Sequence, residues 1–235
     1  SKKSESEKFA GALDTYGVEA LMQDGKALQF GTSHDLGQNF SKSFEIKYAD
    51  KDGEVKYPWQ TSWGVSTRMM GAVIMSHSDD LGLVLPPIIA PIKVVVIPIF
   101  KDENKDEVMK FTQNITGQIT KKIEDTHIDD REYLSPGFKF NEWEKKGVPI
   151  RIEIGQRDIE KDSVTIVRRD INEKKEIKVE DIVGEIERVL IDIQESLLRR
   201  SIEILKKGTH TVESYDEFKK ILLGEKGFIK SYWCG

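Results

Sequence analysis

The sequence has only one cysteine, Cys234, among 235 residues, and this excludes an internal disulfide framework. It also lacks any apolar run approaching the roughly 18 to 20 residues of a membrane span. Its first residues, 1–8, are polar or charged and contain no apolar core of a secretory signal. These absences, with a lone cysteine that fits a reducing compartment, predict a cytoplasmic protein without a membrane partner.

An excess of positive charge is also missing. The 36 lysines and arginines are outnumbered by 41 aspartates and glutamates, which gives a net charge of −5. A protein that coats nucleic acid would be basic overall, so that class is disfavoured. A basic face on an acidic protein can still bind RNA, because local fields act at the contact. The length allows one or two domains with a sizeable core.

The N-terminal region, residues 1–88, predicts an antiparallel sheet followed by a helix. Residues 44–48 alternate apolar and polar side chains, as a half-buried strand does. Residues 50–53 carry a turn signal. After Thr67 the period changes, and small or flexible side chains recur at helical spacing as far as His77. This pattern predicts a buried helix directly after a strand.

A proline-rich stretch, residues 86–91, marks the best domain boundary. Residues 92–99 are almost continuously apolar and β-branched, which predicts a central strand covered on both faces. A charged helix, a loop at residues 135–137 and two further strands follow, and this order indicates an α/β domain over residues 92–182. The helix is expected over residues 103–122, and the two strands over residues 149–154 and 164–167.

The C-terminal region, residues 183–235, predicts a long amphipathic helix as far as Lys206, with Gly208 as its stop signal. A shorter helix around residues 215–223 and a strand-like end follow. A core-facing helix is favoured over a membrane-surface helix. The apolar stripe of the long helix consists of Ile186, Val189, Leu190, Ile193, Leu197 and Leu205.

Residues 29–40 combine amide and hydroxyl side chains with glycines. Gly31 and Gly37 let the backbone approach a ligand closely, and three polar side chains could orient a small polar ligand. The other interpretation is a turn with local side-chain hydrogen bonds. The three polar side chains are Gln29, Thr32 and His34.

Residues 62–68 place small residues after a strand and an arginine at the start of a helix. Gly64 has no side chain, so a flat base could lie against the sheet there. Arg68 can bind phosphate oxygens through two parallel hydrogen bonds. The other interpretation is a surface arginine that pairs with a carboxylate.

Residues 64–68, Gly-Val-Ser-Thr-Arg, resemble motif 3 of the class II aminoacyl-tRNA synthetases. Residues 31–40 resemble the segment before motif 3 in prolyl-tRNA synthetases of the archaeal and eukaryote-like type. Residues 8–11 are similar to a segment further upstream in the same enzymes. Residues 135–158 resemble the anticodon-binding domain of that family. The matches follow one another in the family's order over nearly the whole chain.

The resemblance implies a fold that is α+β in its first part and α/β in its second. Three parts are expected. They are the C-terminal part of a class II antiparallel-sheet catalytic domain (1–88), an α/β anticodon-binding domain (92–182), and a long helix with the start of a small C-terminal domain (183–235).

The resemblance also implies that the parent protein joins L-proline to tRNA(Pro) with ATP, through a prolyl-adenylate. Arg68 would be the catalytic residue, on the γ-phosphate of ATP, and Mg²⁺ would help to neutralise the phosphates. Aromatic walls would suit the proline ring. The implied ATP-binding residues are Gln29, Thr32, Gly64 and Arg68. The implied proline-binding residues are Phe9, His34, Trp63 and Ser66.

The anticodon-like region adds candidate contacts with tRNA. A glutamate can accept a hydrogen bond from a base amino group, and an arginine can donate two to a guanine edge. Aromatic residues alternate with these charges, and core packing is the favoured interpretation of Trp143. The implied anticodon-binding residues are Lys139, Glu142, Arg151 and Arg157.

Nothing in the sequence matches class II motifs 1 and 2, which in this family form much of the dimer interface and supply an arginine for the α-phosphate. We therefore expect this chain to be one piece of a longer homodimeric protein that does not aminoacylate tRNA by itself. Cys234 resembles the first cysteine of a zinc-binding C-terminal domain, but structural zinc needs four ligands. No metal site is expected within the chain, and Zn²⁺ would need residues beyond Gly235. The alternative is that the parent protein is a non-catalytic relative of the synthetases that binds tRNA or acts as a regulator. Such relatives usually lack the ATP-binding arginine, so the presence of Arg68 favours the enzyme.

Overall fold

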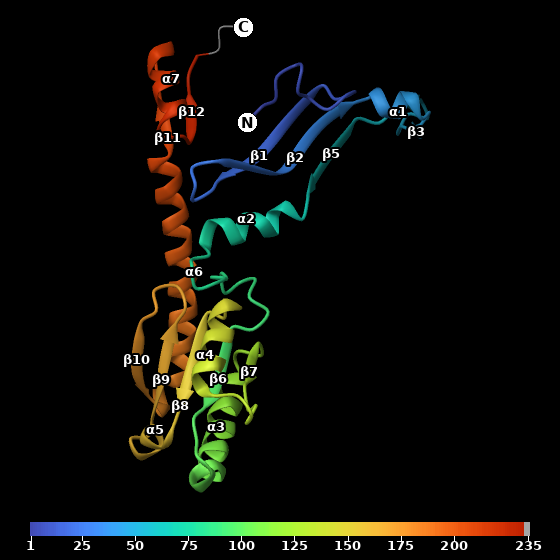
Figure 1. The fold of residues 1–235 in the computed structure, drawn as a ribbon. Coiled ribbons are helices and arrows are strands. Elements are labelled where there is room, and N and C mark those ends of the chain that lie inside the picture. Colours follow the sequence, from blue (N-terminus) through green and yellow to red (C-terminus); the bar gives the residue numbers. More distant parts are fainter. Residues whose placement is uncertain (233–235) are drawn as a thin grey trace. The chain divides into compact units, whose positions relative to one another are not determined.

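The computed structural model describes residues 1–232 (Figure 1). Its internal contacts divide the chain into two compact units. Unit 1 comprises residues 1–76 together with the segment that begins at Ile204, and unit 2 comprises residues 77–203. Each unit is built on its own sheet.

The main sheet of unit 1 has three antiparallel strands. They are β1 (Asp14–Leu21), β2 (Ala27–Gly37) and β5 (Gln60–Val65), in the order β1-β2-β5. In the register, His34 of β2 pairs with Thr15 of β1 and Ser62 of β5. Thr32 of β2 pairs with Gly64 of β5. The antiparallel sheet predicted for this region is therefore present.

A short helix and a two-stranded ribbon connect β2 with β5. They are α1 (Asn39–Ser43), β3 (Tyr48–Ala49) and β4 (Val55–Lys56). The strand predicted over residues 44–48 is wrong except at its last residue. Glu45 has a φ of 53° and the N–H of Phe44 bonds the carbonyl of Phe40, so this stretch closes α1 instead of extending. The predicted turn at residues 50–53 does connect β3 with β4.

Helix α2 (Arg68–His77) follows β5 as predicted, but it is not a buried helix. Only Ala72 is buried, whereas Met70 is 69 % exposed and Ile74 is 44 % exposed. Helical spacing of apolar residues determines that a helix forms, but burial also needs a covering element. The described residues of unit 1 do not supply that cover for α2.

The C-terminal segment of unit 1 forms two parallel strands joined through a helix. These elements are β11 (Thr209–Thr211), α7 (Tyr215–Leu223) and β12 (Phe228–Lys230), and α7 confirms the helix predicted there. Gly227 has a φ of 102°, and a Cβ added to it would lie 2.3 Å from the carbonyl oxygen of Gly208. Glycine is therefore required where β12 approaches the start of β11.

Unit 2 is built on a five-stranded mixed sheet. Its strands are β6 (Val94–Pro98), β7 (Thr126–Ile128), β8 (Ile150–Ile154), β9 (Ser163–Arg168) and β10 (Lys174–Lys178), in the order β10-β9-β8-β6-β7. β6 runs parallel to β7 and β8, whereas β9 is antiparallel to β8 and β10. β6 is buried along its whole length, which confirms the predicted central strand.

Helices cover both faces of this sheet. They are α3 (Lys105–Thr120), α4 (Pro136–Lys145), α5 (Gln156–Glu160) and α6 (Ile182–Lys207), with 3₁₀ turns at Asp102–Asn104 and Val179–Asp181. Val94 and Val96 of β6 belong to the core formed with α3 and α6. Val95 and Ile97 belong to the core on the other face, with Trp143 of α4. Successive side chains of β6 therefore pack alternately into the hydrophobic cores on the two faces of the sheet.

The loop expected at residues 135–137 is instead the start of α4. The hydroxyl of Ser135 accepts a hydrogen bond from the N–H of Phe138 at 3.3 Å, and Pro136 occupies the first turn. Serine at the cap and proline in the first turn are both favoured at a helix N-terminus.

Helix α6 confirms the predicted long amphipathic helix. Its stripe packs into the unit 2 core from Ile186 to Leu197, with Leu190 only partly buried, whereas Leu205 is 46 % exposed. Because this half of α6 closes the core, the contact-defined unit 2 continues past the predicted bound at residue 182. It also begins before residue 92, since Asp79 is held by two hydrogen bonds from Arg169, at 2.6 and 2.8 Å.

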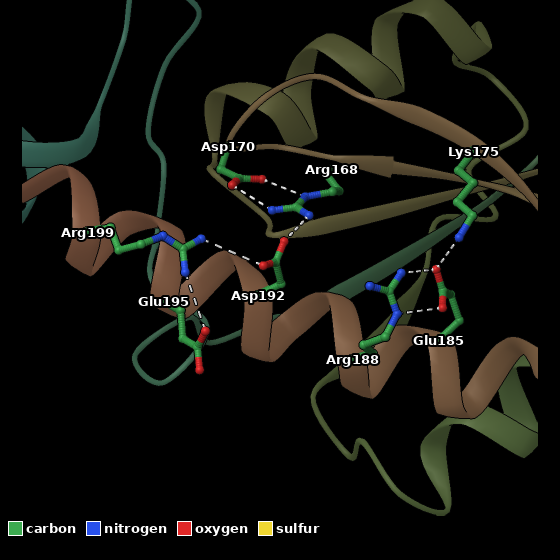
Figure 2. Close-up of polar contacts among 8 residues, drawn as sticks. All are labelled: Arg168, Asp170, Lys175, Glu185, Arg188, Asp192, Glu195 and Arg199. Carbon is green, nitrogen blue, oxygen red and sulfur yellow. Dashed lines mark hydrogen bonds and ion pairs between the residues drawn. The ribbon is translucent and has the colours of Figure 1, made fainter.

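Ion pairs connect the polar side of α6 to β9 and β10 (Figure 2). Arg168 of β9 binds both Asp170 and Asp192, and the second of these lies on α6. Glu185 of α6 accepts hydrogen bonds from Arg188 and from Lys175 of β10. These two cations, Arg188 foremost, lower the pKa of Glu185 to about 2.

Candidate functional site

A β-bulge on β2 places the side chains of Gln29, Thr32 and His34 on one face of the unit 1 sheet. Strand residues alternate between faces, so Gln29 and Thr32 would ordinarily lie on opposite sides. The register with β1 shifts by one residue and leaves Phe30 without a partner. Gln29 therefore lies on the face of Thr32. A Cβ added to Gly17, which pairs with Thr32, would lie 3.6 Å from Gln29 Oε1.

A pocket of about 330 Å³ opens on this face, between β2, β5 and the start of α2. Every predicted ATP- or proline-binding residue except Phe9 lines it. These residues are Gln29, Thr32, His34, Trp63, Gly64, Ser66 and Arg68. A Cβ added to Gly64 would meet no atom within 4 Å, so bare backbone faces open space there. The pocket can therefore admit a flat group against the strand.

The imidazole of His34 is held between two threonine hydroxyls. Its Nδ1 lies 2.9 Å from Thr15 Oγ1, and its Nε2 lies 3.0 Å from Thr32 Oγ1. Thr15 Oγ1 also accepts a hydrogen bond from the N–H of Phe9. All of these groups are satisfied when Thr15 donates to Nδ1 and Nε2–H donates to Thr32. The hydroxyl proton of Thr32 then remains for a ligand in the pocket.

Arg68 is exposed at the first residue of α2. Its Nη1 lies 3.5 Å from the carbonyl oxygen of Gln29, and its backbone N–H donates to Ser66 Oγ at 3.3 Å. Within residues 1–232 no carboxylate pairs with this guanidinium, so the interpretation as a surface ion pair does not hold there. The charge of Arg68 is available to an anion at the pocket.

The two aromatic residues predicted to bind proline differ in their surroundings. The ring centroid of Phe9 lies 4.9 Å from that of His34. Trp63 lines the pocket but is 78 % exposed, and strand alternation assigns it to the face opposite Gly64. Phe9 is thus beside a predicted proline-binding side chain, whereas the Trp63 ring has no aromatic neighbour among the described residues.

In unit 2 a buried carboxylate organises the predicted anticodon-binding region. Asp129 follows β7, and its side chain is fully shielded from solvent. It accepts hydrogen bonds from Arg131 Nε at 2.8 Å, Arg131 Nη2 at 2.7 Å and Trp143 Nε1 at 2.7 Å. Burial alone would raise the pKa of Asp129, but these donors outweigh it and hold the pKa well below its usual range. Trp143 is buried, as predicted for a core residue.

The same cluster contains two of the predicted anticodon-binding residues. Lys139 is only 2 % exposed, and its ammonium donates to the carbonyl of Asp129 at 2.9 Å. This burial contradicts the predicted contact of Lys139 with the anticodon, because a base cannot reach it. The carboxylate of Glu142 remains partly exposed. Arg131 and then Lys146, as its hydrogen-bond donors, lower its pKa.

The two predicted arginines have unused donors. Arg151 of β8 lies 4.5 Å from the ring centroid of Phe140 and donates Nε and Nη2 to Glu153. Arg157 of α5 is exposed. Within the part of the chain that the structure describes, Nη1 of Arg151 and the guanidinium of Arg157 have no hydrogen-bond partner.

The sequence-based prediction misses Thr15, Asp129 and Arg131. Thr15 acquires its place through the register that pairs it with His34. Asp129 and Arg131 lie in a run of charged residues that reads as an exposed loop. Their partners on α4 are 11 to 14 residues away, so no local pattern marks them.

Two searches of residues 1–232 are negative. No group of three or more histidine, cysteine, aspartate or glutamate side chains is arranged to hold a metal ion. No helix combines the length and apolar character needed to cross a membrane. Cys234, the weak zinc-ligand candidate, lies outside the described residues.

A family comparison first defines the class of unit 2. Residues 93–189 match the family model described as "Anticodon binding domain". The match includes the whole five-stranded sheet, the cluster around Asp129, and the first turns of α6. Unit 2 therefore has the mixed α/β fold of an anticodon-binding domain.

The chain as a whole is similar to proteins named proline–tRNA ligase. It is 50 % identical to that of Natranaerobius thermophilus over 233 residues, which are 99 % of this chain and 48 % of the relative. It is 49 % identical to that of Alkaliphilus oremlandii, over 100 % of this chain and 48 % of the relative. It is 51 % identical to that of Roseiflexus sp. strain RS-1, over 99 % and 49 %. The chain belongs to the proline–tRNA ligase family and matches the C-terminal portion of its members. It spans about half the length of these curated relatives.

Proposed function

We propose that the protein to which this chain belongs attaches L-proline to tRNA(Pro) with ATP, through a prolyl-adenylate, in protein biosynthesis. The observation that carries the proposal is the identity of about 50 % with proline–tRNA ligases over nearly the whole chain. The proposal includes a catalytic-domain role for residues 1–88, a homodimer formed through residues outside this chain, and a cytoplasmic location.

The pocket of unit 1 supports a role in ATP binding. Arg68, which pairs with no carboxylate within residues 1–232, binds the γ-phosphate, while the bare backbone at Gly64 accepts the adenine base. Gln29 and Thr32 contact the nucleotide from β2. Mg²⁺, if it enters with the triphosphate, would neutralise part of the phosphate charge beside Arg68.

Proline activation needs alignment more than side-chain chemistry. The carboxylate oxygen of proline attacks the α-phosphorus of ATP, and the bond to the β-phosphate oxygen breaks, so that pyrophosphate leaves. His34 and Phe9 form one side of the proline site. When His34 Nε2–H donates to Thr32, the hydroxyl of Thr32 can donate in turn to the nucleotide that it contacts.

Polar groups of unit 2 that keep hydrogen-bonding capacity within residues 1–232 support a role in tRNA binding. Glu142 presents a carboxylate that accepts hydrogen bonds from base amino groups. Arg151 and Arg157 present donors for base edges or phosphates. Lys139 is excluded from this set by its burial.

Two measurements on two forms of the protein test the proposal. The 235-residue chain is expected to bind tRNA(Pro) but not to aminoacylate it. The native-length polypeptide, whose intact mass is measured first, is expected to exchange pyrophosphate into ATP only when proline is present. Arg68→Ala should abolish the exchange and leave the Kd for tRNA unchanged.

Three results would contradict parts of the proposal. Binding of tRNA by the native-length polypeptide without proline-dependent exchange would identify a non-catalytic tRNA-binding relative. Exchange with another amino acid would refute the assignment of proline. Aminoacylation by the 235-residue chain would refute the expectation that its site is incomplete.

A further inference from the structure

We propose that Arg131, anchored by the buried Asp129, is a positioning residue that fixes the carboxylate of Glu142 for a base of the tRNA anticodon. The inference rests on the proposed function of unit 2, and it adds two residues that neither the sequence pattern nor the family match assigns to tRNA recognition.

The guanidinium of Arg131 is shared between two carboxylates. Its Nε and Nη2 donate to Asp129 at 2.8 and 2.7 Å, and the same Nη2 donates to Glu142 Oε2 at 2.6 Å. The backbone N–H of Arg131 also donates to Asp129 Oδ1 at 3.3 Å. A planar fork with two bonds to one carboxylate has a single orientation, and the backbone bond to the same carboxylate holds the start of the side chain. The direction of the remaining guanidinium donors is therefore fixed as well.

The anchor is itself immobilised. The side chain of Asp129 is fully buried, and Trp143 Nε1 donates to its Oδ2 at 2.7 Å. Its backbone is held at both ends, because its N–H donates to the carbonyl of Val96 at 2.9 Å and its carbonyl accepts from Lys139 at 2.9 Å. A side chain locked by packing and hydrogen bonds transmits its position to the group that it binds.

Glu142 is the exposed end of this chain of contacts. Its side chain is 24 % exposed, and each carboxylate oxygen has one donor: Arg131 on Oε2 and Lys146 on Oε1. Each oxygen keeps acceptor capacity for a ligand. A fixed carboxylate favours a base edge that presents an amino group and repels one that presents a carbonyl oxygen. Glu142 can therefore discriminate between bases because its carboxylate is held in one orientation.

Lys146 does not fix the orientation in the same way. Its ammonium is a single point charge on a side chain that is 50 % exposed, and it also lies 4.3 Å from the ring centroid of Trp143. Lysine makes no planar two-point contact. The assignment of the positioning role to Arg131 follows from this difference.

The test measures discrimination by the complete 235-residue chain. The Kd is determined for a tRNA(Pro) transcript and for three transcripts that each carry one replaced anticodon base. The ratio of Kd values at each position reports recognition of that base. The variants are Glu142→Gln, Arg131→Gln, Arg131→Lys and the double variant Glu142→Gln with Arg131→Gln.

At one anticodon position, Glu142→Gln and Arg131→Gln should each reduce the ratio of Kd values by about tenfold. That is the discrimination expected from one specific contact with a base. The double variant should show no further loss. Arg131→Lys keeps the charge but not the fork, and should recover less than half of the lost discrimination. The matched control is Arg188→Gln, which removes another arginine–glutamate pair of unit 2 and should leave every ratio unchanged.

The outcomes separate the inference from the function on which it rests. If the unaltered chain binds all four transcripts equally, the proposed function of unit 2 fails. If the chain discriminates, the inference is overturned by an unchanged ratio in Arg131→Gln or in Glu142→Gln. It is equally overturned if the two losses multiply in the double variant. A folded Arg131→Lys, checked by circular dichroism, keeps the test decisive should Arg131→Gln not fold.

Discussion

Replacing Asp129 by asparagine should destabilise unit 2 far more than a surface charge change does. Asparagine keeps the shape of the side chain, but it removes the charge opposite Arg131 and turns one acceptor into an NH₂ group that faces donors. Removal of one partner from a buried ion pair costs about 3–5 kcal/mol. The three side-chain bonds act as one network and do not add, so we expect a loss of about 3–5 kcal/mol in the free energy of unfolding.

The loss should also depend on pH. The pKa of Asp129 is lower in the folded chain than its value of roughly 3.9 in an unfolded chain. Its contribution is therefore fully present above about pH 4 and is lost as pH falls through the folded-state pKa. The difference between the unaltered chain and Asp129→Asn should shrink accordingly in acid.

Urea unfolding followed by circular dichroism at pH 7 and at lower pH values measures both effects. Asp192→Asn is the control. The Asp192 side chain is 41 % exposed, and Arg168 keeps its pair with Asp170 when Asp192 is replaced, so the loss should cost about 1 kcal/mol or less (Figure 2). A loss below about 1 kcal/mol for Asp129→Asn, or a loss equal to that of Asp192→Asn, would refute the reasoning.

Four further substitutions test other parts of the structure. Glu185→Gln should cost about 1 kcal/mol at pH 7, because the cations around Glu185 are exposed. Since the folded pKa of about 2 is depressed, the difference in urea midpoint should vanish as pH falls from 4.5 through 2. Gly64→Val should leave the Tm unchanged but raise the KM for ATP in pyrophosphate exchange, and an unchanged KM would argue against a base at this strand. Gly227→Ala should lower the free energy of unfolding of unit 1 by more than about 1 kcal/mol, measured in urea. Thr15→Val should raise the KM for proline about tenfold with kcat little changed, because His34 loses the bond that fixes its tautomer.

Patterns within one element predict this structure well. The buried run at residues 92–99 and the stripe of α6 identify their elements because each contains its own periodicity. The strand expected over residues 44–48 fails for a related reason. Its alternation is real, but the positive φ of Glu45 and the closing turn of α1 override a short pattern.

Contacts between residues on different strands and helices could not be predicted from the sequence. Resemblance names Gln29, Thr32 and Arg68 together, but only the bulge and the register explain how they share a face. Lys139 is a residue that the resemblance assigns to the anticodon but that the structure buries. A lysine in a charged helix reads as exposed, and only the backbone carbonyl of Asp129 accounts for an ammonium inside the core.

Because of the bulge at Phe30, a change of chain length has different effects at different places along β1 and β2. Lengthening the hairpin at residues 22–26 by one residue would change only the size of a turn. Adding or removing one residue between Gln29 and Gly31 would move the side chain of Gln29 to the other face of the sheet, away from Thr32. Alignments of distant relatives, and redesigns of substrate choice, should therefore treat the count of residues here as fixed, whatever identities change.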